Sequence, residues 1–496
     1  MASVNQNKYT NFAGEAKILE GLVAYAKQFS QNIGHPFTDS TILLTAISGS
    51  AATEIGGSTT ASIYHYMREK DQALHHDINC FKDTRLNFVD EISFASYKIL
   101  TKMSANLKSF TECRDHVYGK HPICFLGDFC QLEPVLAEPI YNTRNGIYWE
   151  QALNCMVELK GTHRFNNCPH MRRIMPNLRN GVLSEEDRKI LNSRVINGRD
   201  IKKPDPLATK YAVAHNVKRD EINVSVFRNY LQTYHRGKTE SETPPTAIVI
   251  MSTTKWKKSQ RKLSFDQRKV LFEECSESHC KIGSQMGTPF LCLFAGCNLM
   301  VTKNIEVILG IANGTTCRIR KVILKQEAEL KRITMYDCWV NSVSIEDVEG
   351  IEVEWLDCNK FVGTFRLTSH NGTFRVKYPI CEFGMNQRVS TNIELRYFPI
   401  IANHATTGHK LQGKTVTSLV IAEWSKLKNW AYVVLSRVKT IDGLFMTHPI
   451  PADIDFSPPA NYLDMMQNLR QTILATPEQV SELKQSMNYS EPVFVM

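Results

Sequence analysis

The chain of 496 residues has 43% hydrophobic and 22% charged side chains and a formal net charge of +9. Its length exceeds what one hydrophobic core supports and predicts about three or four folding units. No stretch approaches the roughly 18 to 20 apolar residues of a membrane span, and the first residues lack the pattern of a signal peptide. We therefore expect a soluble, intracellular protein of the nucleus or a mitochondrion, with no membrane partner. The positive charge fits a polyanion as partner without requiring one.

The first part of the chain alternates between helix and strand patterns. Small residues from Ser48 to Thr59 would let a ligand approach the backbone closely, and the polar, irregular residues 64–85 indicate a small insertion. The expected elements are helices over 13–28 and 93–107 and strands over 41–46, 86–89 and 123–126.

The second part continues this alternation but is interrupted by a β-rich segment. Residues 237–282 are polar and basic and are interpreted as an insertion or linker, whose cations form either a binding patch or a solvated face. From 286 to 398, short strands with Asn313-Gly314 and Asn371-Gly372 as turns predict a small β domain. The remaining expected elements are helices within 171–192, from 216 past Phe227 and over 430–437, and strands over 211–214 and 418–422. The alternation predicts an α/β fold with a parallel core.

The 14 cysteines are scattered, and several lie in apolar, strand-like runs. In a chain of this size that distribution indicates reduced thiols rather than a disulfide framework. Cys275 and Cys280, with His279 between them, form the one local cluster. Because no second pair lies at the spacing of a zinc finger, loop chemistry is favoured over a metal site there.

Two of the expected strands end at acidic residues. The strand 86–89 is followed by Asp90 and Glu91, and the later strand 123–126 by Asp128. Open α/β sheets bind ligands at the carboxyl ends of their strands. There one carboxylate can hold Mg²⁺ through its waters while another orients an attacking water for phosphoryl transfer. Taken alone, the Asp-Glu pair also fits the start of a solvated loop. The acidic residue after the second strand favours a nucleotide site instead.

Six motifs in chain order resemble those of the Pif-type (petite integration frequency) DNA helicases. They are Thr45 to Thr59, Asp90 to Ser93, Gly127 to Val135, His163-Arg164, His409 to Thr415 and Tyr432 to Arg437, and the resemblance spans about residues 10 to 447. It implies two RecA-like P-loop NTPase domains with parallel sheets and a small SH3-like β insertion in the second. It further implies ATP hydrolysis with Mg²⁺, 5′-to-3′ movement along single-stranded DNA, and a setting in DNA replication, repair or recombination. The implied partners are single-stranded and forked or structured DNA, bound by a monomer.

The resemblance also assigns roles residue by residue. It implies Asp90 as the Mg²⁺ ligand and Glu91 as the residue that activates water. Gln131 resembles the sensor of the γ-phosphate, and Arg164 and Arg437 resemble two arginines that reach it, a task that suits a planar guanidinium. The residues implied at the nucleotide are Gly14, Lys17, Asp128 and Gly413, and those implied at DNA are Ser48, Gly49, Thr59, His409, Lys410, Gln412 and Thr415.

The largest departure from the family pattern lies at the nucleotide-binding loop. A P-loop needs glycine-rich backbone around the phosphates, a lysine, and a Ser or Thr on Mg²⁺. The chain has only Gly14-Glu15-Ala16-Lys17, where relatives commonly carry Gly-Glu-x followed by Gly-Thr-Gly-Lys-Ser. Aligned without a gap, an acid stands where the lysine belongs; with a gap, about five residues are missing before Lys17. A truncated or mis-spliced gene sequence, a deletion and a decayed paralogue each explain this. The formal P-loop spacing from Gly408 to Thr415 precedes a strand-like run, so no phosphate cradle is expected there.

The expected domains are a first RecA-like domain, the start of a second with a basic insertion, a β-rich insertion, the rest of the second domain, and a tail. Their boundaries are 1–205 (with the insertion 64–85), 206–285, 286–398, 399–450 and 451–496. Three functions stay open: a Pif-type helicase, a nucleic-acid-binding paralogue without ATPase activity, and the helicase part of a larger replicative or rolling-circle transposon protein.

Overall fold

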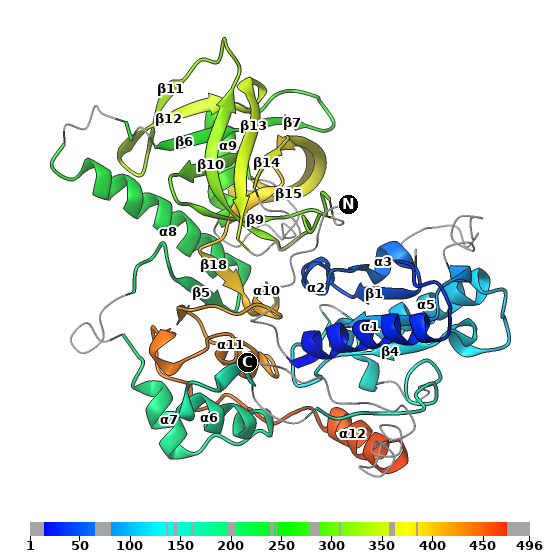
Figure 1. Cartoon of the computed structure of the whole chain (residues 1–496). Helices are drawn as coiled ribbons and strands as arrows, with labels where there is room; N and C mark the ends of the chain where they lie inside the picture. Colours follow the sequence, from blue (N-terminus) through cyan, green and yellow to red (C-terminus); the bar gives the residue numbers. More distant parts are fainter. Residues whose placement is uncertain are drawn as a thin grey trace. The chain divides into compact units, whose positions relative to one another are not determined.

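The computed structural model describes most of the chain, and its elements are labelled in Figure 1. The described residues are 14–64, 81–134, 137–142, 146–159, 163–196, 204–238, 243–244, 246–276, 288–306, 309–356, 363–382 and 385–473. The chain divides into two compact units, the first made of Met1–Ile47, Thr60–Asn166 and Ser457–Met496, and the second of Ser48–Thr59 and Asn167–Phe456. The first unit thus combines residues from the beginning and from the end of the chain.

The first unit contains a parallel sheet. Strand β1 (Ile42–Ala46) pairs with β3 (Leu86–Asp90), which pairs with β4 (Ile123–Phe125), and both pairings are parallel. Helix α1 (Gly14–Asn32) precedes this sheet, and helix α5 (Tyr97–Phe110) joins β3 to β4. Helix α5 buries one face at helical spacing, formed by Leu100, Met103, Ser104, Leu107 and Phe110. The strands and helices expected for this part are thereby confirmed, with α5 beginning four residues later than expected.

The first unit also contains helix α12 (Ala460–Thr472) from the chain's end. Its Tyr462 ring lies 6.2 Å from that of Phe129 and 6.1 Å from that of Tyr141, and the Trp149 indole donates a hydrogen bond to Met465 Sδ. These aromatic contacts fix the helix beside the residues that follow β4. The described part of the expected tail thus includes a helix that packs within the first unit.

The α/β part of the second unit is built on a second parallel sheet. Its strands lie in the order β18 (Ala405–Thr407), β5 (Lys210–Val213), β19 (Leu419–Ile421) and β20 (Leu444–Met446), all parallel. The helices of this part are α6 (Pro169–Arg179), α7 (Glu185–Asn192), α8 (Asn216–His235), α10 (Gly408–Leu411) and α11 (Trp430–Leu435). Two parallel sheets confirm the expected fold class, an α/β chain with two RecA-like domains.

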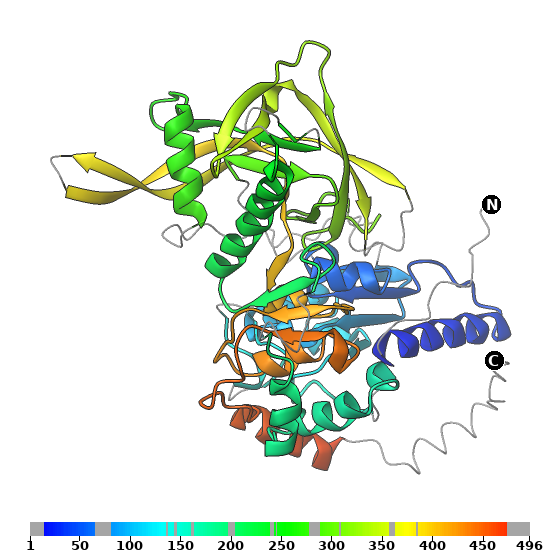
Figure 2. The same cartoon turned by 90° about the vertical axis from the view of Figure 1, so that its left-hand side faces the viewer.

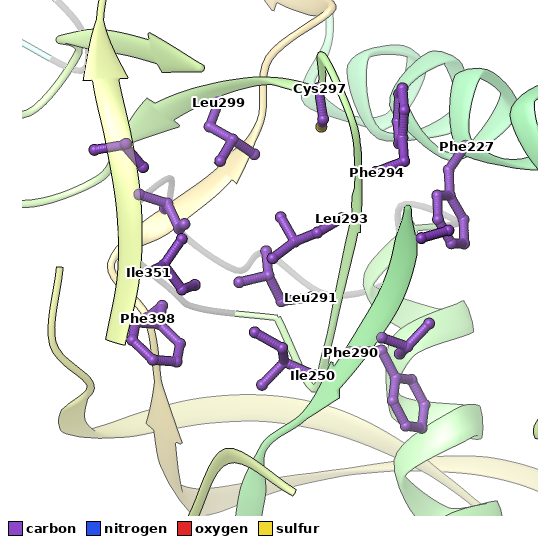
Figure 3. Close-up of a cluster of buried hydrophobic side chains, with 14 of the residues drawn as sticks. Phe227, Ile250, Phe290, Leu291, Leu293, Phe294, Cys297, Leu299, Ile351 and Phe398 are labelled. Atoms are coloured by element: carbon purple, nitrogen blue, oxygen red, sulfur yellow. The ribbon is translucent and has the colours of Figure 1, made fainter. Parts of the chain in front are cut away.

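The β-rich part of the second unit is larger than the sequence suggested. Its sheets have the orders β14-β13-β10-β9-β17, β11-β12-β6-β8 and β15-β16-β7. The strands are β6 (Ala247–Met251), β7 (Thr253–Trp256), β8 (Phe290–Phe294), β9 (Asn298–Val301), β10 (Thr316–Leu324), β11 (Lys331–Met335), β12 (Cys338–Ser344), β13 (Val348–Trp355), β14 (Thr364–Leu367), β15 (His370–Glu382), β16 (Met385–Tyr397) and β17 (Ile400–Ala402). Inward side chains of the first two sheets form an apolar core that includes Phe290, Leu293 and Ile351 (Figure 3). The third sheet contributes Val376, Ile393 and Leu395 to a separate, smaller core.

The structure corrects one expected turn and gives secondary structure to two other segments. Of the two alternatives for the basic segment 237–282, an insertion or a linker, the linker is excluded, because β6 pairs in parallel with β12, β7 pairs with β16, and helix α9 (Phe265–Ser276) follows. Asn371-Gly372 is not a turn but lies inside β15, which with β16 forms the long two-stranded arm in Figure 2. Residues 48–59, for which the sequence indicated only small side chains, contain helix α2 (Gly49–Glu54) and strand β2 (Ser58–Thr59).

The physical reasons lie in neighbours that are distant in sequence. The Ala247-to-Met251 run is continuously apolar and has polar residues only at its flanks, and its partners come from residues 290–294 and 341–344. Asn371 and Gly372 pair with Arg396 and Leu395 of β16, so they continue the strand. Glycine is needed there for packing, because a Cβ would lie 2.7 Å from Cζ of Phe374. Most of the expected insertion 64–85 and the Cys280 end of the cysteine cluster lie outside the described residues.

Candidate nucleotide and nucleic-acid sites

The acidic ends of β3 and β4 are held together by backbone hydrogen bonds. Leu126 N donates to Val89 O at 2.9 Å, and Ile92 N donates to Leu126 O at 3.0 Å. On the other side of β3, Ile47 N donates to Asp90 O at 3.2 Å. Asp90 and the residues after β4 therefore lie at the same carboxyl edge of the first sheet, as the sequence predicts.

Glu91 has an unusual backbone conformation. Its φ of 53° and ψ of 43° lie in the left-handed region, and its side chain is 9% exposed. A residue with a Cβ costs about 1 kcal/mol or more in this region, and such strain concentrates at functional sites. The conformation is imposed by the turn, because Phe94 N donates to Glu91 O and the next residue is tied to β4. Glu91 is thus fixed at the strand end by its surroundings.

The turn after β4 places Gln131 next to Asp128. Cys130 N donates to Asp128 Oδ1 at 3.0 Å, and Gln131 N donates to Asp128 O at 3.0 Å. This is the Asx-type turn that aspartate forms with the backbone two residues on. Gly127 precedes it with φ of 153°, and a Cβ there would lie 3.0 Å from Ile92 N. Glycine lets this turn lie directly against the turn that holds Glu91.

The donor chemistry at this edge fits Mg²⁺. Asp90, Glu91 and Asp128 supply carboxylate oxygens from two adjacent strand ends, and Mg²⁺ is a hard cation that prefers oxygen. Mg²⁺ commonly takes one or two carboxylates together with waters and substrate phosphates. Within the described residues, no group of three or more His, Cys, Asp or Glu side chains is arranged to hold a metal ion by itself.

The residues expected at the P-loop lie in the first turn of α1. Helix α1 spans Gly14–Asn32 and includes Lys17. The sequence carries Glu15 beside these residues, an acid that opposes binding of a triphosphate.

The two candidate arginines lie in different units. Arg164 is half-buried in the short 3₁₀ helix His163–Phe165 of the first unit. Arg437 of the second unit is 4% exposed, and its Nε donates to Val433 O at 2.9 Å. Its guanidinium also donates to Ser436 Oγ at 2.7 Å, so it is held against the end of α11.

The expected DNA-contact residues meet within the second unit. Gly49 at the start of α2 packs so closely on the loop before β10 that a Cβ there would lie 2.9 Å from Ala312 Cβ. On the other side of that loop, Lys410 Nζ donates to Asn313 Oδ1 at 2.9 Å and Lys414 Nζ donates to Gly314 O at 2.6 Å. The cluster formed by α2, residues 304–306 and 309–315, and Lys410 with Lys414 is called the loop cluster below.

The other residues expected at DNA surround this cluster or support it. Ser48 accepts a hydrogen bond from Ala51 N and caps α2, while Thr59 is buried in β2. In and after α10, Gln412 is 6% exposed and Thr415 is exposed. The Gly413 position has φ of 77°, a left-handed turn that ends this short helix.

Burial changes the charge state of two side chains of α10. Burial, followed by the charges of Lys414 and Arg219, lowers the pKa of Lys410 to about 8. Burial also lowers the pKa of His409, which favours a neutral imidazole. Lys410 therefore loses its positive charge just above neutral pH unless an anion stabilises it.

The sequence did not identify two asparagines of the loop cluster. Asn304 Oδ1 accepts a hydrogen bond from Asn313 N, and Asn313 Oδ1 accepts one from Lys410 Nζ. The Asn313-Gly314 pair did predict a turn, and Gly314 has φ of 101°. The turn signal carries no information about its partners, because α2 and Lys410 come from distant parts of the chain.

We predict that Gly408→Ala destabilises the second unit by about 1–3 kcal/mol, the usual cost of overpacking. A Cβ at Gly408 would lie 2.4 Å from Nε1 of Trp430, whose side chain is 1% exposed. Denaturant unfolding measures the change. Gly21→Ala in α1 is the control, because a Cβ there meets nothing within 4 Å, and an equal effect of both substitutions would contradict the packing argument.

No described helix is long and apolar enough to cross a membrane. No protein-family model matches the sequence, and no curated protein matches it.

Solved structures do resemble the chain. A structure of DNA unwinding at forked dsDNA by two coordinating Pif1 helicases is 17% identical, with a TM-score of 0.60 over 92% of this chain and 90% of that one. Pif1 from Bacteroides in complex with ADP-AlF3 and ssDNA is also 17% identical, with a TM-score of 0.60 over 93% and 98% of the two chains. Pif1 from Candida albicans is 17% identical, with a TM-score of 0.58 over 93% of this chain and 100% of that one. The chain therefore has the fold of the Pif1 helicases.

Proposed function

We propose that the protein is an ATP-dependent 5′-to-3′ DNA helicase, which couples ATP hydrolysis to movement along single-stranded DNA and to duplex unwinding. The observation that carries this proposal is the chain path around α2. Residues Ser48–Thr59 belong to the second unit, while the residues before and after them belong to the first. In the proposal, this segment couples the nucleotide reaction to the DNA contact, because its chain is continuous with the first unit at both ends. The same segment forms part of the loop cluster.

At the nucleotide end, the proposed reaction is attack of a water oxygen on the γ-phosphorus of ATP. The bond from that phosphorus to the bridging oxygen of ADP breaks, and the carboxylate of Glu91 accepts the proton of the water. Asp90, with Asp128 beside it, would hold Mg²⁺, which neutralises charge on the phosphates. Gln131, fixed by the Asp128 turn, would contact the γ-phosphate and respond to its loss.

At the DNA end, we propose that the loop cluster contacts the backbone of a single strand. Lys410 and Lys414 supply positive charge, and their hydrogen bonds to Asn313 and Gly314 fix the position of that charge. Phosphate contacts of this kind position a protein without reading sequence. The partners expected are single-stranded and forked DNA, which the solved Pif1 structures also contain.

ATP hydrolysis measured with and without single-stranded DNA tests the proposal. We expect DNA to stimulate turnover. Hydrolysis that is absent at millimolar MgATP, in a protein that still binds DNA, would overturn it.

The second candidate function is a DNA-binding protein that does not hydrolyse ATP. The observation in its favour is the first turn of α1, where Glu15 opposes binding of a triphosphate. It predicts salt-sensitive binding of single strands with no turnover.

We also predict that affinity for single-stranded DNA falls as the pH rises through the lowered pKa of Lys410, about 8. Below this pH the ammonium is charged and can contact phosphate; above it the amine is neutral. The slope of log K against log salt should become shallower by about 0.7, the value for one lost contact. In Lys410→Arg the charge persists, so its affinity should not change over this range. Equal pH dependence in both proteins would contradict the assignment.

A further inference from the structure

A polar pocket lies in the β-rich part, where β6 passes into β7. Its volume is about 180 Å³, and the hydroxyl-bearing residues Ser252, Thr254 and Ser344 line it together with Lys262 and Arg268. Ser252 and Thr254 are each only 2% exposed. Since one water takes about 30 Å³ of the liquid, the pocket has room for a phosphate group. Hydroxyls and cations around one cavity are the donors that a phosphate requires.

The surface beside the pocket is strongly basic. Residues 252–269 contain seven Lys or Arg residues and one Asp, which is six of the nine net positive charges of the chain. The exposed cations are Lys257, Lys258, Arg261, Lys262 and Lys269. None of these five makes an ion pair with a residue that the structure describes. We call the turn between β7 and α9, with these cations, the basic turn.

Other surface cations of the same unit form ion pairs. On neighbouring strands of the β-rich part, Arg320 pairs with Glu354 at 2.6 Å and Arg366 pairs with Glu349 at 2.7 Å. Lys428 pairs with Asp455 near the end of the unit. Surface cations of this chain are thus commonly balanced by a nearby carboxylate. Among the described residues, Lys257, Lys258, Arg261 and Lys269 form no such ion pair, and Lys262 lies at the pocket that Glu346 also lines. Such a field attracts a polyanion.

The basic turn is fixed by a small core of its own. Leu263, Leu271 and Ile393 are buried together, and the Trp256 ring packs against them. Arg268 Nη1 donates to Ser252 O at 2.8 Å, which holds its guanidinium at the pocket wall. A prearranged set of donors loses little conformational entropy when a ligand binds.

We propose that the basic turn and its pocket bind the phosphodiester backbone of DNA, as a second contact besides the loop cluster. This inference rests on the proposed DNA-binding function. In it, a phosphate lies against Lys262, Arg268 and the pocket hydroxyls, while Lys257 and Lys258 contact the neighbouring phosphates of the same strand. The contact involves the backbone alone, so it is independent of sequence.

The negative charge of Glu346 provides a test of the proposal. It lines the pocket, and Thr253 Oγ1 donates to Glu346 Oε1 at 2.9 Å. This hydrogen bond, with the charges of Lys262, Arg396 and Lys255, keeps Glu346 ionised by lowering its pKa. A fixed carboxylate here repels a phosphate and weakens the site. Removing its charge must therefore tighten DNA binding, whereas a patch with no DNA contact would show no gain.

The experiment measures binding of the full chain to a fluorescent thymidine 30-mer and to a duplex of the same length over a range of salt concentrations. For Lys257→Gln/Lys258→Gln we expect a slope of log K against log salt that is shallower by about 1.4 on the single strand or about 1.8 on the duplex. Glu346→Gln should bind more tightly, because glutamine still accepts from Thr253 but carries no charge. The probe that shows the change identifies the form of DNA that the basic turn contacts.

Lys426→Gln/Lys428→Gln is the matched control, because it removes the same charge from lysines paired with Asp453 and Asp455. It should leave both slopes unchanged. Equal slopes for the basic-turn variant and the wild type on both probes would overturn the inference, as would an unchanged or lower affinity of Glu346→Gln. If the wild type itself binds neither probe, the proposed function fails instead, so the two failures are distinguishable.

Discussion

Glu91→Gln is expected to reduce DNA-stimulated ATP hydrolysis by about 10²- to 10⁴-fold, the usual contribution of a general base. The amide keeps the size and the backbone turn of Glu91 but cannot accept the proton of the attacking water. Binding of single-stranded DNA should stay unchanged, because Glu91 lies in the first unit and the loop cluster in the second. Turnover and DNA binding are measured on the same preparation.

Glu112→Gln is the control for this substitution. Glu112 is an exposed glutamate of the first unit with φ of 55°, nearly the same left-handed backbone as Glu91. The same change of chemistry on the same backbone should leave turnover unaffected. If Glu91→Gln retains full activity, Glu91 is not the residue that activates water.

Insertion of Gly-Thr-Gly-Lys-Ser between Ala16 and Lys17 is expected to lower the KM for ATP by about 100-fold or more. The insert supplies a glycine-rich turn, a lysine for the phosphates and a serine for Mg²⁺ at the start of α1. Two charge-assisted hydrogen bonds of about 1.5–3 kcal/mol each account for a change of this size. Steady-state kinetics over a wide range of MgATP concentrations measures it.

An insert of equal length, Gly-Thr-Gly-Ala-Ser, separates the effect of the lysine from that of the longer loop. It should give a much smaller gain. An unchanged KM with both inserts would show that the first turn of α1 is not where the triphosphate binds.

The sequence predicted the α/β core well because its signals are local. Each strand of the first sheet is a short apolar run, and two of these runs end at Asp90 and before Asp128, so their parallel pairing brings those carboxylates to one edge. The turn at Asn313-Gly314 was likewise predicted from two adjacent residues. The residues that these strands and this turn contact lie far away in the sequence, so they could not be predicted.

The remaining features depend on contacts between distant segments. The contact of Gly49 with Ala312 and the hydrogen bond of Lys410 to Asn313 join parts of the chain with no shared local signal. Strand β6 looked like part of a linker because its flanks are polar, and only pairing with β8 and β12 makes it a core strand. The sequence of helix α12 did not indicate which residues it packs against, because Phe129 and Tyr141 lie more than 300 residues earlier.

The most direct test of the proposed function is strand separation on duplexes that carry one single-stranded tail. With MgATP, we predict that the full chain separates a duplex with a 5′ tail and leaves one with a 3′ tail intact. Binding to both substrates without separation of either would contradict the helicase proposal and favour a DNA-binding protein without motor activity. Separation of the 3′-tailed duplex alone would contradict the proposed direction.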